Sequence, residues 1–157
     1  MSTENTYRRI FDLVAAKKDG SGSTVQFAVG QNDNSANRCV FLTIAKQKPD
    51  TNAENARFDY SNKAIMKLNP VDIGAIMSVL RMREESINKG KGLYHQFEKD
   101  GKTVSSSIKL KKNDPKYGGF FFEIMKEDVK IAMPVSNPNA EVLYAFLTNS
   151  LFYIYGD

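Results

Sequence analysis

The feature that most constrains this fold is an order of predicted elements that occurs twice along the 157-residue chain. In each half, short segments of alternating apolar and polar residues precede an amphipathic helix that starts at an Asn-Pro dipeptide. Asn69-Pro70 and Asn137-Pro138 are 68 residues apart (137 minus 69), and Lys63-Ala-Ile-Met and Lys130-Ile-Ala-Met are 67 residues apart (130 minus 63). A unit that recurs at one spacing predicts two similar halves of a single domain.

The sequence predicts an α+β fold built from two ββββα repeats. Strands are expected at 24–29, 38–46, 56–60 and 63–68 in the first repeat, and at 93–99, 102–111, 118–125 and 129–135 in the second. Residues 7–18 are expected to form a short N-terminal helix, because Ile10, Leu13 and Val14 recur at helical spacing. The predicted organisation is an N-terminal helix and joint at 1–23, then one domain at 24–157 with repeats at about 24–88 and 89–157.

A tight hairpin is the best-defined element of the second repeat. Asp100-Gly101 favours a two-residue turn, which sets a register in which Lys99 faces Lys102 and Leu93 faces Ile108. Alternation then places on the core side Leu93, Phe97, Val104, Ile108 and Leu110. His95 falls in the same row, so we expect it to be partly buried and hydrogen-bonded rather than a ligand or base.

Positive charge is concentrated on this hairpin and its flanks. Residues 89–116 hold eight lysines and three acids, a local charge of +5, whereas the whole chain carries +4. A cationic track with flat rings is what single-stranded nucleic acid needs for its phosphates and unstacked bases. The candidate binding residues are Tyr94, Gln96, Lys99, Lys102, Ser105, Ser107, Lys109, Lys111, Lys112, Tyr117, Phe41 and Phe121. The alternative interpretation is a solvated sheet face whose lysines serve solubility.

Composition argues against several other classes of protein. The only cysteine is Cys39 and the only histidine is His95, so the sequence holds neither a disulfide framework nor a Cys-cluster zinc site, and a Ser-His-Asp triad is not expected. We therefore expect no enzyme activity, cofactor or metal. No apolar run approaches the roughly 20 residues of a membrane span, and residues 1–6 show no targeting pattern, so a cytoplasmic location is expected.

The last predicted helix is apolar nearly all round, which indicates deep burial or packing in a homo-oligomer, a dimer or tetramer.

Several stretches of the chain resemble those of a known protein family. They are Met66-Lys-Leu-Asn-Pro-Val-Asp-Ile-Gly-Ala-Ile-Met-Ser78, Tyr94-His95-Gln96-Phe97, Gly119-Phe-Phe-Phe, and Met133-Pro-Val-Ser with the helix to Gly156. Over roughly residues 24–156, the chain resembles the Whirly family of single-stranded-DNA-binding proteins. The resemblance implies two antiparallel four-stranded sheets packed crosswise with two helices, tetrameric assembly, and binding of single strands along sheet edges with little sequence preference. Related folds occur in mitochondrial RNA-binding proteins and some phage proteins.

The chain also departs from the family, and these departures limit which family properties can be expected of it. The family's Lys-Gly-Lys-Ala motif lies in the first repeat, whereas Lys89-Gly-Lys-Gly lies in the second, so that motif is not transferred. The absence of tryptophan and of a plant-type transit segment favours a bacterial or phage-infected host cell as the source. The predicted function is sequence-independent single-stranded DNA binding in replication, recombination or repair. RNA binding or annealing on the same surface, and a protein-interaction module with an acidic partner, remain the alternatives.

Overall fold

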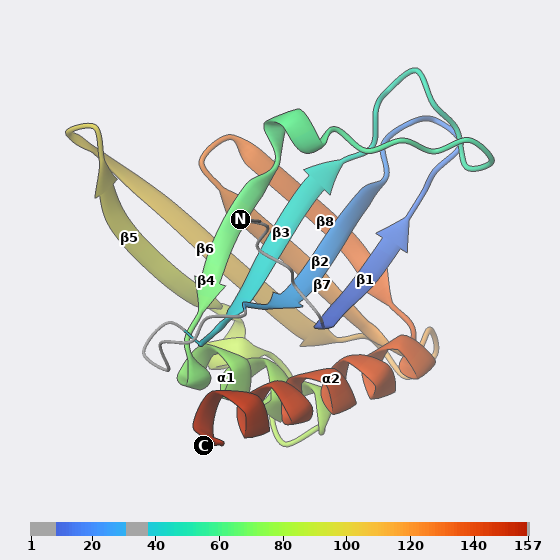
Figure 1. The fold of residues 1–157 in the computed structure, drawn as a ribbon. Coiled ribbons are helices and arrows are strands. Elements are labelled where there is room, and N and C mark those ends of the chain that lie inside the picture. Colours follow the sequence, from blue (N-terminus) through green and yellow to red (C-terminus); the bar gives the residue numbers. More distant parts are fainter. Residues whose placement is uncertain (1–8, 31–37, 157) are drawn as a thin grey trace.

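Each half of the chain folds into four antiparallel strands followed by an α-helix (Figure 1). The structure is a computed structural model that describes residues 9–30 and 38–156. The first half comprises β1 (Arg9–Ala15), β2 (Ser23–Val29), β3 (Val40–Lys46), β4 (Ala64–Leu68) and α1 (Pro70–Leu80). The second comprises β5 (Leu93–Lys99), β6 (Lys102–Lys112), β7 (Phe120–Lys126), β8 (Val129–Val135) and α2 (Asn137–Tyr155). In both sheets the strands lie side by side in chain order, which confirms the predicted α+β class and the two repeats.

The two sheets stack with their apolar faces together, and their strands cross (Figure 1). β8 contacts β1, β2 and β3 of the other sheet, which a strand can do only by running across them. At the centre the rings of Phe27 and Phe122 are 6.2 Å apart, and both side chains are fully buried. One shared core therefore holds the two halves together.

The two helices pack against each other at one end of the sheets (Figure 1). α1 starts at a capping box, in which the Asn69 side chain accepts from the Asp72 backbone and Asp72 accepts from the Asn69 backbone. α2 starts at Ser136, whose hydroxyl accepts from the backbone of Asn139. The predicted start at Asn137-Pro138 is therefore one residue late, because Ser136 takes the capping position.

Where β4 and β8 lead into the helices, equivalent positions of the two halves are 67 residues apart. The two cap residues, Asn69 and Ser136, differ by 67 (136 minus 69), as do the last residues of β4 and β8, Leu68 and Val135. The Lys63 and Lys130 tetrapeptides mark this spacing correctly, whereas the two Asn-Pro dipeptides are not equivalent in position.

The predicted N-terminal helix over 7–18 is wrong, since the described part of that segment, from Arg9, contains β1. Phe11, Leu13 and Ala15 alternate toward the core, and this period of two matches a strand better than the helical spacing does. β1 pairs with β2 from Arg9 opposite Val29 to Ala15 opposite Ser23. The first sheet thus begins inside the segment 1–23, while residues 1–8 lie outside the described part of the chain.

The predicted strand at 56–60 is also wrong. This stretch makes a single bridge, from Phe58 to Gln47, and then a 3-10 turn over Tyr60–Asn62. The β3–β4 loop is held by the buried side chain of Gln47. This side chain hydrogen-bonds the backbone of Thr51 in the loop and the backbone of Lys17 and Gly22 in the β1–β2 connection. The fourth strand of the first sheet, which the sequence analysis placed at 56–60, is therefore β1.

Candidate nucleic-acid interface

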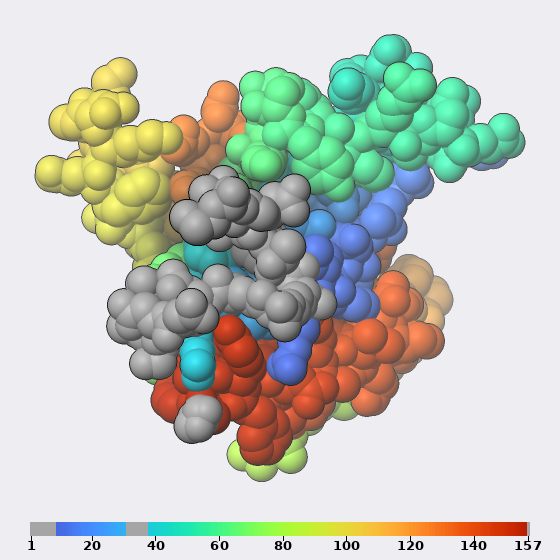
Figure 2. Space-filling model, viewed as in Figure 1, coloured from blue at the N-terminus to red at the C-terminus, as the bar shows by residue number. Residues whose placement is uncertain are grey.

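The β5–β6 hairpin has the predicted register at every pair from Leu93–Ile108 to Lys99–Lys102. Its tip stands away from the rest of the molecule, as the yellow residues of Figure 2 show. Burial on the inner side fades along the hairpin, because Ile108 and Leu110 are buried but Phe97 is 38% exposed. The prediction that Phe97 belongs to the core is therefore wrong, since the hairpin extends past the sheet that would cover it.

The outer face of the second sheet, on the side away from the core, is open along its length. None of its residues is buried, and its exposed or half-buried members are Tyr94, Gln96, Glu98, Thr103, Ser105, Ser107, Lys109, Lys111, Phe121, Glu123, Met125, Lys130, Ala132 and Pro134. The matching face of the first sheet buries Thr24, Ala28 and Ala45. The second sheet thus offers the more open of the two outer faces, and we call this face the single-strand surface.

The edge strand β5 of the single-strand surface carries an exposed aromatic ring opposite the middle of β6. Tyr94 is 58% exposed, and its hydroxyl accepts a hydrogen bond of 2.9 Å from Gln96 Nε2. The hydrogen bond anchors the hydroxyl end of the side chain, and the exposed ring leaves a face accessible. A ring held in this way is suited to stacking with an unpaired base.

At the end of the single-strand surface near the β6–β7 loop, aromatic rings lie beside lysines. Lys111 Nζ lies 5.8 Å from the centre of the Phe121 ring, and Lys111 and Phe121 are cross-strand partners. In the adjoining β6–β7 loop, Lys116 Nζ lies 5.6 Å from the centre of the exposed Tyr117 ring. Each pair offers a cation for a phosphate beside a ring for a base.

Seven of the twelve predicted residues lie together on the single-strand surface: Tyr94, Gln96, Ser105, Ser107, Lys109, Lys111 and Phe121. The structure does not bring the other five onto it. Lys99 and Lys102 lie at the hairpin tip on the inner side, Lys112 lies on the inner row of β6, Tyr117 lies in a loop, and Phe41 lies on the first sheet.

Sequence reasoning missed two charged residues of this surface. Lys130 is exposed on β8 opposite Met125, and Glu123 lies opposite Lys109 on β7. The alternation of apolar residues in 129–135 could have placed Lys130 outward, because Ile131, Met133 and Val135 face the core. Three lysines and two glutamates make the face itself only mildly positive, so much of the local charge lies at its ends and flanks.

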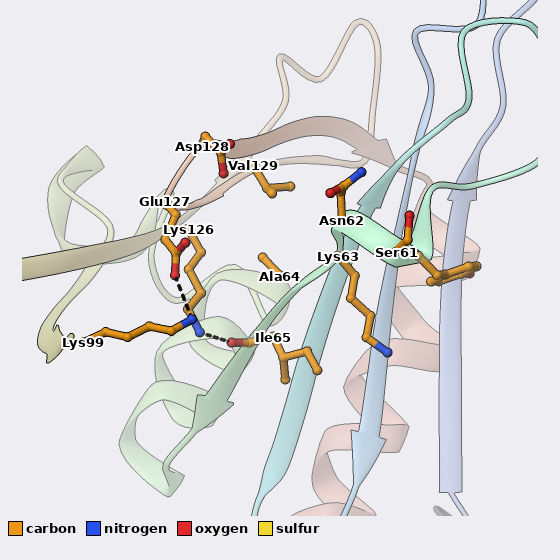
Figure 3. Close-up of a pocket in the computed structure, with 11 residues that line it drawn as sticks. Ser61, Asn62, Lys63, Ala64, Ile65, Lys99, Lys126, Glu127, Asp128 and Val129 are labelled. Carbon is orange, nitrogen blue, oxygen red and sulfur yellow. Dashed lines mark hydrogen bonds and ion pairs between the residues drawn. The ribbon is translucent and has the colours of Figure 1, made fainter. Parts of the chain in front are cut away.

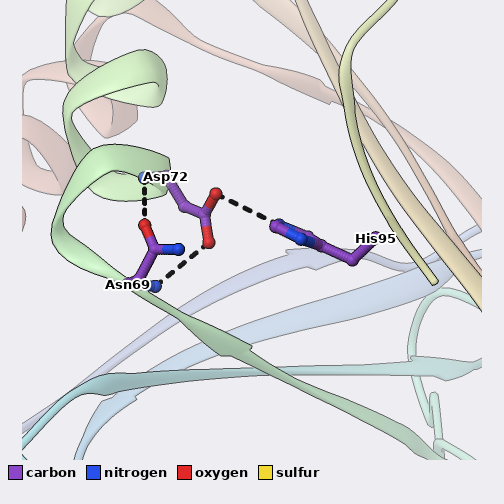
Figure 4. A network of polar contacts seen from close by, with 3 residues as sticks. All are labelled: Asn69, Asp72 and His95. Carbon is purple, nitrogen blue, oxygen red and sulfur yellow. Dashed lines mark hydrogen bonds and ion pairs between the residues drawn. The ribbon is translucent and has the colours of Figure 1, made fainter. Parts of the chain in front are cut away.

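His95 joins the hairpin to the start of α1 (Figure 4). Its Nε2 donates to Asp72 Oδ1 over 3.1 Å, while Asp72 Oδ2 accepts from the Asn69 backbone. The His95 side chain is 45% exposed and that of Asp72 is 5% exposed. This histidine is hydrogen-bonded, as the sequence predicts, but it is exposed and not partly buried, because the hairpin extends beyond the sheet that would cover it. Its bond to Asp72 links the base of the hairpin to the helix.

Searches for other kinds of site are negative within residues 9–30 and 38–156. No group of three or more His, Cys, Asp or Glu residues in this part of the chain is placed to hold a metal ion. In the same residues no helix is both long enough and apolar enough to cross a membrane.

Comparison with known proteins identifies the fold. No model of a known protein family and no curated protein sequence matches the chain. Among solved structures, the chain is similar to MRP1/MRP2 of Trypanosoma bruciei, with a TM-score of 0.60 and 16% identity over 94% of this chain and 86% of that one. It is also similar to a guide-RNA-binding protein complex bound to a gRNA, with a TM-score of 0.60 and 17% identity over 94% of this chain and 92% of that one. Two crossed four-stranded sheets with two helices are thus a known architecture, and membership of the Whirly family stays a prediction.

Proposed function

We propose that this protein binds single-stranded nucleic acid, with little sequence preference, on the outer face of its second sheet. The observation that carries the proposal is the openness of that face, where Tyr94, Phe121 and Lys111 are accessible among hydroxyl groups. Stacking on such rings contributes about 1–3 kcal/mol per base and tolerates any sequence. Lysine contacts with phosphates supply an affinity that depends on salt and not on sequence. The role requires no catalytic group.

The proposed ligand is single-stranded DNA, with a role in replication, recombination or repair in the cytoplasm of a bacterial or phage-infected cell. RNA is the second candidate. The observation that favours RNA is that one structural neighbour, at 17% identity, is a guide-RNA-binding protein complex bound to a gRNA. Hydroxyl and amide groups on the surface, such as those of Ser105, Ser107 and Gln96, can bond bases or sugars of either kind.

Fluorescence anisotropy with labelled oligonucleotides tests this proposal. The probes are a random single strand of DNA, the RNA of the same sequence, and the DNA duplex, each at several salt concentrations. We expect both single strands to bind more tightly than the duplex, with affinity that falls steeply as salt rises. Competition between the matched DNA and RNA ranks the two candidates. If neither single strand binds at low salt, the proposed function is wrong.

We also propose that a second copy of the chain covers part of α2. Phe152 and Tyr155 are each 73% exposed, and with Leu151 they line an apolar hollow of about 430 Å³ near the end of the helix. Adjacent exposed aromatic residues are typical of interaction surfaces. Light scattering after size exclusion is expected to show a dimer or tetramer, and Phe152→Ser with Tyr155→Ser is expected to shift it toward the monomer. A monomer in the unmodified protein would contradict this part of the proposal.

A further inference from the structure

A cleft separates the edge strand β4 from the turn between β7 and β8 (Figure 3). Residues 60–65 line it from the first half of the chain, and Lys99 and residues 126–129 line it from the second. Its volume of about 510 Å³ is within the range of roughly 300–1,000 Å³ usual for small-molecule sites. The cleft lies on the inner side of the hairpin, so it is distinct from the single-strand surface. In Figure 2, the orange β7–β8 turn is visible between the yellow hairpin and the green residues before β4.

Lys126 forms the floor of this cleft. Its Nζ donates to the backbone oxygen of Ile65 on β4, and it also lies 5.0 Å from the centre of the Phe97 ring. Burial lowers the pKa of Lys126 from its ordinary value, and the nearby Lys99 lowers it further, while Glu127 acts in the opposite direction. One ammonium group is therefore held in a partly dry position between the two sheets.

A second ammonium group lies beside the first. Figure 3 shows the side chains of Lys99, from the hairpin, and Lys126, from the end of β7, meeting at their nitrogen ends, and the two charges are near enough to interact. Lys99 Nζ is 3.7 Å from Glu127 Oε1, a long contact for an ion pair, and the Lys99 side chain is 62% exposed. Lys126 alone would suffice to fasten β4 to the second sheet, and the added like charge works against that role. Glu127 balances only one of these two cations, and over all the lining residues Lys63, Lys99 and Lys126 outnumber Glu127 and Asp128.

We infer that this cleft binds a phosphate group, held between the Nζ atoms of Lys99 and Lys126 and carried by a nucleic-acid strand. A phosphate has several acceptor oxygens and can take hydrogen bonds from both ammonium groups at once. The remaining volume of the cleft leaves room for the sugar or base attached to it. The inference rests on the proposed function for the strand as carrier. The carrier group is either a terminal phosphate monoester or an internal phosphodiester of that strand.

The cleft itself is tested with inorganic phosphate and with a nucleoside 5′-monophosphate as probes. NMR of labelled lysine side chains is expected to show shifts at Lys99 and Lys126 and none at Lys18, which is exposed on the β1–β2 loop. Lys99→Met is expected to weaken phosphate binding about tenfold, because one charge-assisted hydrogen bond is lost. Glu127→Gln removes the competing carboxylate and is expected to tighten binding several-fold. Equal shifts at all lysines, or no shift at any, would overturn the inference.

Matched oligonucleotides then distinguish the two carriers. If a terminal phosphate is bound, a 5′- or 3′-phosphorylated single strand binds several-fold more tightly than the unphosphorylated strand, and Lys99→Met abolishes that preference. If an internal phosphodiester is bound, Lys99→Met weakens both strands equally and lowers the salt slope by roughly 0.7, the value for one contact with a single strand. In a third outcome, Lys99→Met leaves three quantities unchanged: the affinity for single strands, the preference for phosphorylated strands and the salt slope. That result would overturn the inference that the bound phosphate belongs to a strand. Phosphate shifts without any strand binding would refute the proposed function and leave the anion site standing.

Discussion

The two sheets share a strand order and a core, yet their outer faces differ. The first sheet buries Thr24, Ala28 and Ala45 on its outer face, whereas no residue on the outer face of the second is buried. The connections differ as well: β5–β6 and β7–β8 are two-residue turns, while the β3–β4 connection runs from Gln47 to Lys63. The same architecture therefore has a partly buried outer face in one half and an open outer face in the other, and the difference lies in loops and outward residues.

The largest expected effect tests what the halves have in common. Phe27→Ala and Phe122→Ala each remove a fully buried ring, one from each sheet, and each is expected to lower the free energy of unfolding by about 3–5 kcal/mol. Since the two rings are in contact, the double variant is expected to lose less than the sum. Urea unfolding followed by circular dichroism measures this, with Val71→Ala on the exposed face of α1 as the control. A much smaller cost at one ring would show that the sheets do not share a core equally.

The next effect tests how the outer faces differ. Lys109→Glu with Lys111→Glu on the second sheet is expected to weaken single-strand binding by roughly 10–100-fold at low salt and to reduce the salt slope. Lys67→Glu, an exposed outward lysine on β4 of the first sheet, is the matched control and is expected to change affinity little. Anisotropy titrations measure both variants. Equal losses in the two would mean that the binding face has been assigned to the wrong sheet.

A smaller effect compares the starts of the two helices. The Asp72 side chain has two roles at α1, since it completes the capping box and accepts from His95, whereas Ser136 makes one capping bond at α2. We expect Asp72→Ala to cost about 2 kcal/mol and Ser136→Ala about 1 kcal/mol in unfolding free energy. After Asp72→Ala, a further His95→Ala change is expected to cost little, because its partner is already gone. If Asp72→Ala and Ser136→Ala lower the unfolding free energy equally, the two helix starts do not differ in the way described.

The smallest effect concerns a thiol that only the first half carries. Burial raises the pKa of Cys39 above its ordinary value of 9.0. Because the folded state keeps a proton that the unfolded chain releases, the thiol's stabilising contribution is complete below about pH 9 and is lost as pH rises through the raised pKa. The difference in stability between the unmodified protein and Cys39→Ala is therefore expected to be smaller at about pH 10 than at about pH 7. A difference that does not vary with pH would contradict the assigned cause.

Local patterns predicted those parts of the fold that depend on neighbouring residues. The two-residue turn at Asp100-Gly101 determined the hairpin register, and Pro70 with its cap determined the start of α1. The prediction failed at β1, where Ile10, Leu13 and Val14 fit a helical spacing while the sheet selected the period of Phe11, Leu13 and Ala15. Secondary structure there depends on pairing with β2, which no local pattern records.

The candidate site was predictable only in part, for a similar reason. Alternation correctly grouped Tyr94 with Lys109 and Lys111, because faces of a strand follow from its period. How far a face extends under a neighbouring sheet depends on tertiary packing, so Phe97 was wrongly assigned to the core. The approach of Lys126 to Ile65, 61 residues away, likewise follows from the crossing of the sheets and from no sequence motif.

The simple strand order of each sheet has a kinetic consequence. Every paired strand in both sheets is the neighbour of its partner along the chain, so each sheet can assemble through successive hairpins with little loop-closure entropy. Such a meander has a lower contact order than sandwiches whose strands cross between sheets, and it favours faster folding. Neither half can hide its apolar face alone, however, so docking of the two halves is expected to be the cooperative step, and an isolated half would be prone to aggregate.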